Sequence, residues 1–299
     1  MTLLVLAEDG DETAARFARF ATGRGVDTVV AAGFDRLSVT VTVSRGLRHR
    51  STVLVDGRPP VGILCRGLPA ASPSVPASAS ASAAAAAASS ASASASATAA
   101  ARFAAAERQA ALWAAVALWP GPVVNRPTVY GCPPRLDPLE LAASTSRIRA
   151  AGTLANGPDE PGNHAYRLDD HAELDPAART PYDVVHVTRI DAGRTRRFLV
   201  AGAATFALGS PADRRALARR AREVATIRDW LHARRTEFAI VTVSTPDGDD
   251  GDDGDNRDDR DDKGDGPLLL LEASPWVSHH RFGPVEDAAY AALLGRLVP

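Results

Sequence analysis

The first 35 residues alternate between two short apolar runs and one amphipathic segment, and this order restricts the chain to few folds. Residues 2–8, TLLVLAE, and residues 27–35, DTVVAAGFD, are predicted strands. Residues 11–25 between them form a predicted helix that Asp11 caps. Strands joined through a helix run parallel, and a parallel sheet needs helices on its faces. The sequence therefore predicts an α/β fold at its start.

More strands follow this β-α-β unit. Residues 36–44, RLSVTVTVS, alternate as a half-exposed strand does, and residues 49–60 contain the turn dipeptide Asp56-Gly57. Residues 61–67, VGILCRG, form another buried strand, and residues 102–121 form a helix that ends at Pro120-Gly121. In this helix Phe103, Leu112, Val116 and Trp119 are expected to share one apolar face.

The second half of the chain groups strands together, which is typical of an α+β arrangement. Predicted strands are 182–190, 194–202, 203–209, 238–244 and 266–275. A long helix over 210–235 is predicted to begin with the cap Ser210 and with Pro211 and Asp213 in its first turn. Its buried stripe is expected to consist of Leu217, Val224, Ile227 and Leu231.

Two tracts of biased composition divide the chain. Residues 70–101 are almost all Ala, Ser and Pro, with too little apolar side chain to offset the entropy of ordering, so a disordered insertion is predicted. Residues 247–265 hold eleven Asp and are predicted to be a disordered acidic loop. The predicted domains are therefore 1–69, completed by the helix and strand of 102–125, and 126–299.

Composition excludes several classes of protein. No apolar run approaches the roughly 18 residues of a membrane span, and the N-terminus lacks the features of a secretory signal, so a cytoplasmic location is expected. Cys65 and Cys132 are too few for a disulfide framework and are expected to be buried or incidental thiols. The arginines of 214–222 lack neighbouring aromatic residues, so no nucleic-acid partner is expected.

The ordered set of segments resembles the ATP-grasp ligases, and within them the glutamate-ligase and peptide-macrocycle-ligase branch. The resemblance rests on DETA after the first strand, NRP at 125–127, RRFLVAG at 196–202, FAIVTV at 238–243 and LLLLEAS at 268–274. It implies a small pre-ATP-grasp domain followed by a shortened ATP-grasp-like domain. It also implies ATP and Mg²⁺ as cofactors, and an acyl-phosphate reaction between a carboxylate and an amine of a peptide or small molecule. Whether the chain forms a homodimer is left open.

The resemblance also implies roles for individual residues. Glu272 and Ser274 correspond to the Glu-x-Asn metal ligands of the family, and Thr242 stands where the family has a metal-binding Asp. Arg197 corresponds to the arginine that contacts the phosphate or acyl intermediate. The resemblance also assigns Arg66 to the catalytic cleft, and Arg196 and Asn125 to nucleotide binding.

Two interpretations of the function stay open. The retained Glu272 and Arg197 favour a working carboxylate–amine ligase. The family holds the nucleotide phosphates with two lysines, whereas Lys263 is the only lysine of this chain and lies in the acidic tract. That deficit, together with Thr242 in place of Asp, favours a non-catalytic pseudo-ligase that binds a peptide or a partner protein.

Overall fold

The structure is a computed structural model of the whole chain, and its coordinates divide into two compact units. The first comprises Met1–Pro134 and Leu293–Pro299, and the second comprises Arg135–Ala292. The residues that the structure describes are 1–44, 49–69, 87–129, 131–134, 136–150, 153–155, 163–167, 185–189, 194–245 and 267–298. The acidic tract 247–265 and residues 70–86 of the Ala/Ser-rich tract lie outside them.

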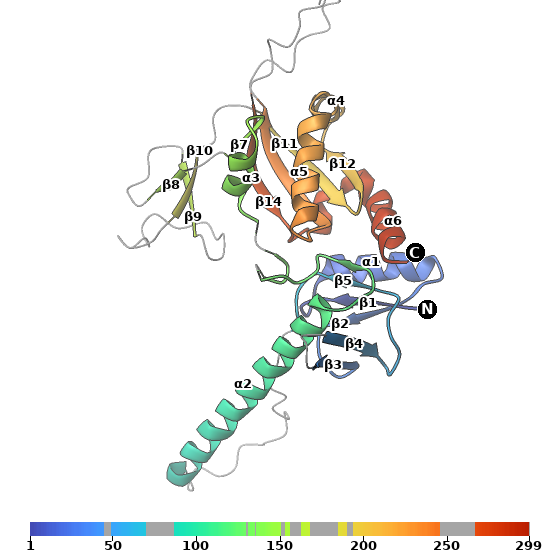
Figure 1. The fold of residues 1–299 in the computed structure, drawn as a ribbon, viewed down its shortest axis with the longest axis vertical. Helices are drawn as coiled ribbons and strands as arrows, with labels where there is room; N and C mark the ends of the chain where they lie inside the picture. The colour runs from blue at the N-terminus through green and yellow to red at the C-terminus, as the bar shows by residue number, and fades with distance from the viewer. Residues whose placement is uncertain are drawn as a thin grey trace, which may run out of the picture. The chain divides into compact units, whose positions relative to one another are not determined.

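A four-stranded parallel sheet forms the centre of the first unit (Figure 1). The strand order is β2-β1-β5-β6, so the chain turns to opposite sides of β1 to add β2 and β5. This arrangement confirms the predicted parallel α/β fold. The strands are β1 (Thr2–Leu6), β2 (Asp27–Ala31), β5 (Gly62–Cys65) and β6 (Val123–Val124).

Helix α1 (Glu12–Gly23) begins at the residue that the sequence predicts as its cap. Asp11 accepts a hydrogen bond from the backbone N–H of Ala14 at 3.0 Å, which satisfies one of the free donors of the first turn. Ala14, Phe17 and Ala21 recur at helical spacing and are buried. The helix therefore presents one apolar face to the core of the unit.

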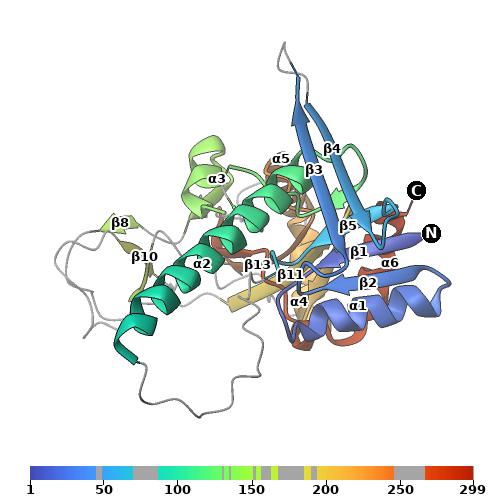
Figure 2. The ribbon, with the colours of Figure 1, turned by 90° about the horizontal axis from the view of Figure 1, so that it is seen from below.

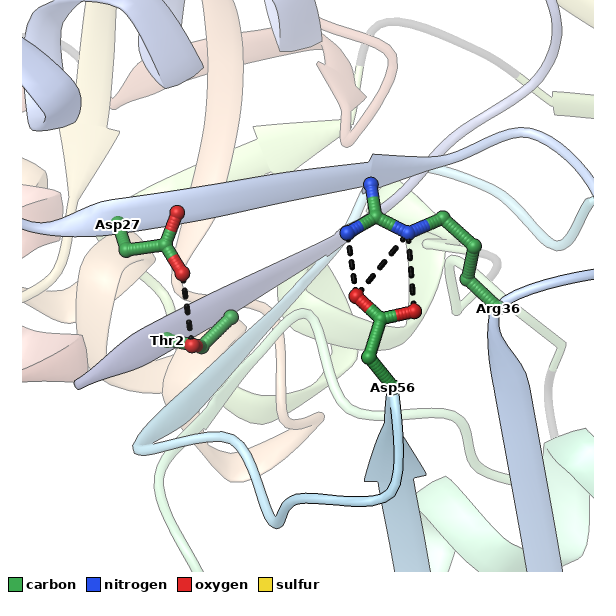
Figure 3. A network of polar contacts seen from close by, with 4 residues as sticks. All are labelled: Thr2, Asp27, Arg36 and Asp56. Carbon is green, nitrogen blue, oxygen red and sulfur yellow. Dashed lines mark hydrogen bonds and ion pairs between the residues drawn. The ribbon is translucent and has the colours of Figure 1, made fainter.

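A hairpin of β3 (Leu37–Val43) and β4 (His49–Val55) completes this core. Asp56 and Gly57 both have positive φ and turn the chain back after β4, as the sequence predicts. Arg36 donates from Nε to both carboxylate oxygens of Asp56 at 3.1 Å, so the two ends of the hairpin are joined (Figure 3). The same view shows the Thr2 hydroxyl donating to Asp27 at 2.8 Å between β1 and β2.

Helix α2 (Ala87–Ala117) lies beside this hairpin (Figure 2). It includes residues 87–101, for which the sequence predicts a disordered insertion; the high helix propensity of alanine accounts for the difference. Leu112, Val116 and Trp119 are buried as expected, whereas Phe103 is 68% exposed. The expectation for Phe103 was wrong: beside it only the small side chain of Ala105 is buried, and the larger buried side chains begin at Leu112.

A five-stranded sheet of order β12-β11-β13-β14-β7 forms the second unit (Figure 1). Its four longer strands are antiparallel, and the short β7 joins the edge of β14 in parallel. A separate small sheet has the order β8-β10-β9. The strands are β7 (Ile148–Ala150), β8 (Thr153–Ala155), β9 (Asn163–Arg167), β10 (Val185–Arg189), β11 (Arg194–Ala201), β12 (Ala204–Leu208), β13 (Phe238–Thr245) and β14 (Leu268–Ser274).

One face of this sheet is covered by helices. The long helix predicted over 210–235 is divided at Arg220 into α4 (Pro211–Arg219) and α5 (Ala221–Ala233). Ser210 and Asp213 form the expected capping box. The predicted stripe and α3 (Pro138–Ser144) pack against the strands; the buried cluster includes Leu217, Val224, Ile227, Leu231, Leu141, Phe198, Val200, Val241, Val243, Leu268, Leu270 and Ala273.

The last helix, α6 (Glu286–Leu297), connects the second unit back to the first, because its residues from Leu293 onward belong to the first unit. Within the first unit, the carbonyl of Leu297 packs closely against Gly62 of β5. No helix among the described residues combines the length and the apolar character that a membrane crossing requires.

Candidate functional site

Three candidate residues stand in one row across the five-stranded sheet. Arg197 of β11 pairs directly with Thr242 of β13, and Thr242 pairs directly with Glu272 of β14. Residues that are directly opposite in antiparallel strands share a face of the sheet. With strands about 4.8 Å apart, the row spans about 10 Å from the first backbone to the third. A guanidinium, a hydroxyl and a carboxylate are thereby brought together on one surface.

A β-bulge places Glu272 in this row. Val243 pairs with Leu270 whereas Thr242 pairs with Glu272, so Leu271 is an extra residue on β14. Leu270 and Ala273 both belong to the helix-covered core, although residues three apart in a regular strand would face opposite sides of the sheet. Simple alternation from Leu270 would have directed Glu272 into that core. The bulge reverses the alternation and leaves the carboxylate exposed on the opposite face.

The middle residue of the row carries a buried polar atom. Thr242 is 7% exposed, and its Oγ1 has no hydrogen-bond partner among the described residues. A buried hydroxyl without a partner costs about 1–3 kcal/mol, so most such groups in folded proteins are satisfied by protein, water or ligand. The exposed Arg197 and Glu272 stand on either side of it. This position therefore suits a polar ligand atom.

Ser274 extends the row along β14. It pairs with Ile240 on β13, two residues from the Thr242–Glu272 pair, and so lies on the same face. Its hydroxyl oxygen accepts a hydrogen bond from the backbone N–H of Trp276 at 3.3 Å, and a hydroxyl oxygen has a second lone pair for another contact. Glu272, Thr242 and Ser274 together offer three oxygen donors, which is the ligand type that Mg²⁺ prefers.

The other end of this face is closed by aromatic side chains. Phe238 at the start of β13 meets Phe282 edge-on, with ring centroids 6.0 Å apart, and Phe282 meets Tyr290 of α6 at 5.6 Å. All three rings are at most 2% exposed. Apolar packing thus covers the sheet near Phe238, and the polar row lies where the same strands carry exposed charges.

Arg196 lies on the opposite face from Arg197, as neighbouring residues of a strand must. It pairs with Val243, is 2% exposed, and its Nε lies 3.7 Å from Oδ1 of Asp213 in the first turn of α4. The structure therefore brings Arg196 together with Asp213 beneath the helices, and Arg197 with Thr242 and Glu272 on the other surface. Sequence reasoning named Asp213 only as a capping residue.

The candidates of the first unit lie at the carboxyl ends of its parallel strands. Arg66 follows β5 and donates to Asp11 from Nε at 3.0 Å and from Nη2 at 3.2 Å. Asn125 follows β6, is fully buried and has a φ of +53°, a conformation that asparagine tolerates better than most residues. Ligands of open α/β sheets bind at such strand ends. Asp11, the partner of Arg66, is the functional candidate that sequence reasoning did not propose, although its place beside the end of β1 was a signal.

The number of acidic side chains near the row limits how tightly it could hold a metal ion. Among the described residues, no three Asp, Glu, His or Cys side chains come together as a group that could hold a metal ion. Glu272 is the one carboxylate of the row, because Thr242 and Ser274 carry hydroxyls. A cation bound there would therefore need further oxygen ligands from its own counter-ions or from water.

Comparison with known proteins shows the fold. The sequence matches no family model and no curated protein. Its structure is similar to an ATP-grasp ligase associated with ribosomally synthesised peptides from Chryseobacterium gregarium, complexed with ADP and a leader and core peptide, at 11% identity over 99% of this chain and 96% of the other, with a TM-score of 0.56. The ATP-grasp ligase PsnB, complexed with minimal precursor, Mg and ADP, aligns at 12% identity over 99% and 98%, with a TM-score of 0.56. The macrocyclase MdnB from Microcystis aeruginosa aligns at 12% identity over 98% and 99%, with a TM-score of 0.57.

Proposed function

We propose that this chain, which has the ATP-grasp fold, is a peptide-modifying ligase that couples ATP to the joining of a carboxylate and an amine. The row of Arg197, Thr242 and Glu272 is the observation that carries the proposal. Support comes from solved structures of the same fold, which hold ADP, Mg or precursor peptides. The substrate class proposed is a peptide with a reactive carboxylate and amine.

The proposed reaction makes an amide in two steps. The terminal phosphoryl group of ATP passes to a substrate carboxylate oxygen, which gives an acyl phosphate and ADP. The amine nitrogen then bonds to the carbonyl carbon, the bond from that carbon to the phosphate oxygen breaks, and the amine loses a proton. Phosphoryl transfer depends mainly on positioning and on neutralising charge. The residues proposed here are suited to both tasks.

Arg197 is proposed to bind the transferred phosphate or the acyl phosphate. A guanidinium donates two parallel N–H bonds to a phosphate, and it stays charged at all relevant pH values. Arg197 is exposed, and it stands beside a buried hydroxyl that has no partner among the residues the structure describes, so it is accessible to a ligand. Arg66, tied to Asp11 in the first unit, and Asn125 are proposed to contact the substrate and the nucleotide respectively. Arg196 is the weakest of the proposed nucleotide contacts, because it is 2% exposed beside Asp213.

Glu272, Thr242 and Ser274 are proposed to hold Mg²⁺. All three supply oxygen, and the buried Oγ1 of Thr242 is an atom that a ligand could satisfy. Bound magnesium would offset phosphate charge during transfer. The single carboxylate predicts weaker metal binding than a site with two acids would have, because hard-cation affinity increases with ligand charge.

Thermal unfolding tests the proposal directly. A ligand that binds only the folded state stabilises it by about 2.7 kcal/mol at one hundred times its Kd, which is a rise in Tm of several degrees for a chain of this size. We expect such a rise with ATP and MgCl₂ together, and a much smaller one with either alone. Arg197→Gln and Glu272→Gln should remove it, whereas Glu107→Gln on the exposed surface of α2 should keep it. No rise at millimolar nucleotide overturns the proposal.

A non-catalytic pseudo-ligase is the second candidate. Thr242 in place of an acid and the single lysine, Lys263, favour it. Release of ADP in the presence of a carboxylate- and amine-bearing peptide separates the two functions. The ligase produces ADP in step with amide product. The pseudo-ligase produces neither, and its melting temperature rises with the peptide alone.

A further inference from the structure

The two cysteines of the chain, Cys65 and Cys132, meet in the first unit. Cys65 is the last residue of β5 and is fully buried. Cys132 is half-buried and packs against the core cluster to which Cys65 belongs, so the two thiols lie in the same part of the unit. Because these are the only thiols of the whole sequence, their contact joins parts of the chain that are far apart in sequence.

Both thiols are held by ordered backbone. Cys65 is paired with Leu6 in the parallel sheet. Cys132 follows Gly131, whose N–H donates to the carbonyl of Thr128 at 3.0 Å and whose carbonyl accepts from Thr128 at 3.1 Å. Before Cys132 in the chain, Arg126 donates to the carbonyls of Val116 and Ala117 at the end of α2. It also donates to the carbonyls of Trp119 at 2.6 Å and Gly121 at 2.9 Å, just after this helix. The pair is thus anchored at both ends.

The two thiols differ in their access to solvent. Burial raises the pKa of the Cys65 thiol, the hydrogen bond with Cys132 raises it further, and the charge of Arg126 acts in the opposite direction. Cys65 therefore stays protonated and shielded. The thiolate is the reactive form of cysteine, and the partly exposed Cys132 is the thiol that a reagent in solution meets first.

We propose that Cys65 and Cys132 form a reversible disulfide, a modification site that fastens the chain at Cys132 to the end of β5. The oxidant is a small-molecule disulfide. The Cys132 thiolate attacks one of its sulfurs and expels a thiolate, which leaves a mixed disulfide on Cys132. The Cys65 sulfur then loses its proton and attacks the Cys132 sulfur, and the second small thiol leaves. Two electrons and two protons pass from the protein to the oxidant.

The position of the pair gives the modification a consequence. Cys132 lies two residues before Pro134, the last residue of the first unit before the chain continues into the second. Cys65 directly precedes Arg66, the buried partner of Asp11. The disulfide therefore ties the exit of the chain from the first unit to the end of β5, directly before Arg66. Its formation does not require that the chain be a ligase.

Thiol counting under oxidation tests this inference. The full-length protein is incubated with glutathione disulfide, then denatured and treated with a maleimide, and its mass and peptide map are measured. We expect loss of both free thiols, one cross-linked peptide pair containing residues 65 and 132, and full reversal by dithiothreitol. Stable glutathione adducts on the wild-type protein, disulfide-linked dimers, or two free thiols after oxidation would each overturn it.

Single variants separate the two steps. Cys65→Ala should accumulate one glutathione adduct on Cys132, because the resolving thiol is gone. Cys132→Ser should retain a Cys65 thiol that reacts with the maleimide only after denaturation. Far-UV circular dichroism checks that each variant folds. If Cys65→Ala does not fold, the wild-type peptide map and Cys132→Ser, which changes a half-buried position, decide the matter.

Discussion

Thr242 and Glu272 face each other across β13 and β14, with the hydroxyl of the first buried and the carboxylate of the second exposed. The first prediction concerns this hydroxyl. Thr242→Val keeps the shape of the side chain and removes a buried polar atom that has no partner among the described residues. We expect the free energy of unfolding to rise by about 1 kcal/mol in the absence of ligand. Urea denaturation measures it, and a loss of similar size would show that the hydroxyl is hydrogen-bonded in the folded protein.

Thr242→Asp tests the charge deficit of the row. A second carboxylate opposite Glu272 would raise the negative charge available to a magnesium ion. We expect the affinity for ATP in the presence of Mg²⁺ to increase at least tenfold, which is about 1.4 kcal/mol of binding free energy. Titration calorimetry at several magnesium concentrations measures it. Thr242→Asn, which adds no charge, is the matched control. Equal affinities for the two variants would contradict a metal site at this row.

Asp11 is predicted to be the most sensitive acid of the first unit. It caps α1 and also accepts two hydrogen bonds from Arg66, whose side chain is 6% exposed. Asp11→Ala should lower the free energy of unfolding by about 3–5 kcal/mol, because a buried charge loses its ionic partner. Asp27→Ala, which removes a hydrogen bond to Thr2 at the surface, should cost about 0.5 kcal/mol or less. Chemical denaturation compares them, and similar losses would contradict the role given to the Arg66–Asp11 pair.

Gly62 is predicted to tolerate no larger side chain. A Cβ at this position would lie 2.4 Å from the carbonyl oxygen of Leu297 and 3.0 Å from its carbonyl carbon. Gly62→Ala should therefore displace the end of α6 or the start of β5 and cost about 1–3 kcal/mol. Gly23→Ala, in α1, has open space around the new methyl group and is the control. An unchanged thermal midpoint for Gly62→Ala would show that the end of α6 does not pack there.

The Arg36–Asp56 pair predicts a dependence of stability on pH. The hydrogen bond from Arg36 lowers the pKa of the Asp56 carboxyl below its usual 3.8. The ion pair therefore stabilises the fold at pH values above that usual pKa, and its contribution is lost as the pH falls through the lower folded value. The Tm of wild type should exceed that of Asp56→Asn slightly at neutral pH, because the pair is exposed. The difference should close in acid, and Arg36→Gln should reproduce the same profile; a gap that stays constant with pH would contradict the pairing.

The local elements could be predicted from sequence because their signals are local. Asp11 and Ser210 cap the helices that they precede, and Leu217, Val224, Ile227 and Leu231 are all buried at helical spacing. The short helix α3 was missed although Asp137, Pro138 and Glu140 form a regular helix start. The proline- and glycine-rich composition around it outweighed that signal.

The sequence allowed Arg197, Thr242 and Glu272 to be proposed one by one, but it did not predict that they lie side by side on one face of the sheet. The existence of this row depends on the pairing of β11 with β13 and of β13 with β14, and such pairings join residues that are distant in sequence. The resemblance assigned Arg196 and Arg197 different roles, but the sequence could not tell which of them faces away from the helices, because only the position of α4 and Asp213 decides which face is covered. The resemblance indicated the fold, and the register of the strands shows which of the candidate residues share a face of the sheet.

The extra residue in β14 determines how this strand would respond to a change in its length. Residues 268–271 are four leucines, so the loss of any one of them would shorten the strand by one residue and leave the same kind of side chain at each remaining position. Such a deletion would remove the extra residue and restore plain alternation, with Leu270 still in the core and Glu272 still opposite Thr242 on the other face. A one-codon deletion in this run of leucines is therefore expected to leave the face of Glu272 unchanged and to alter only the local bend and twist that the bulge gives the strand.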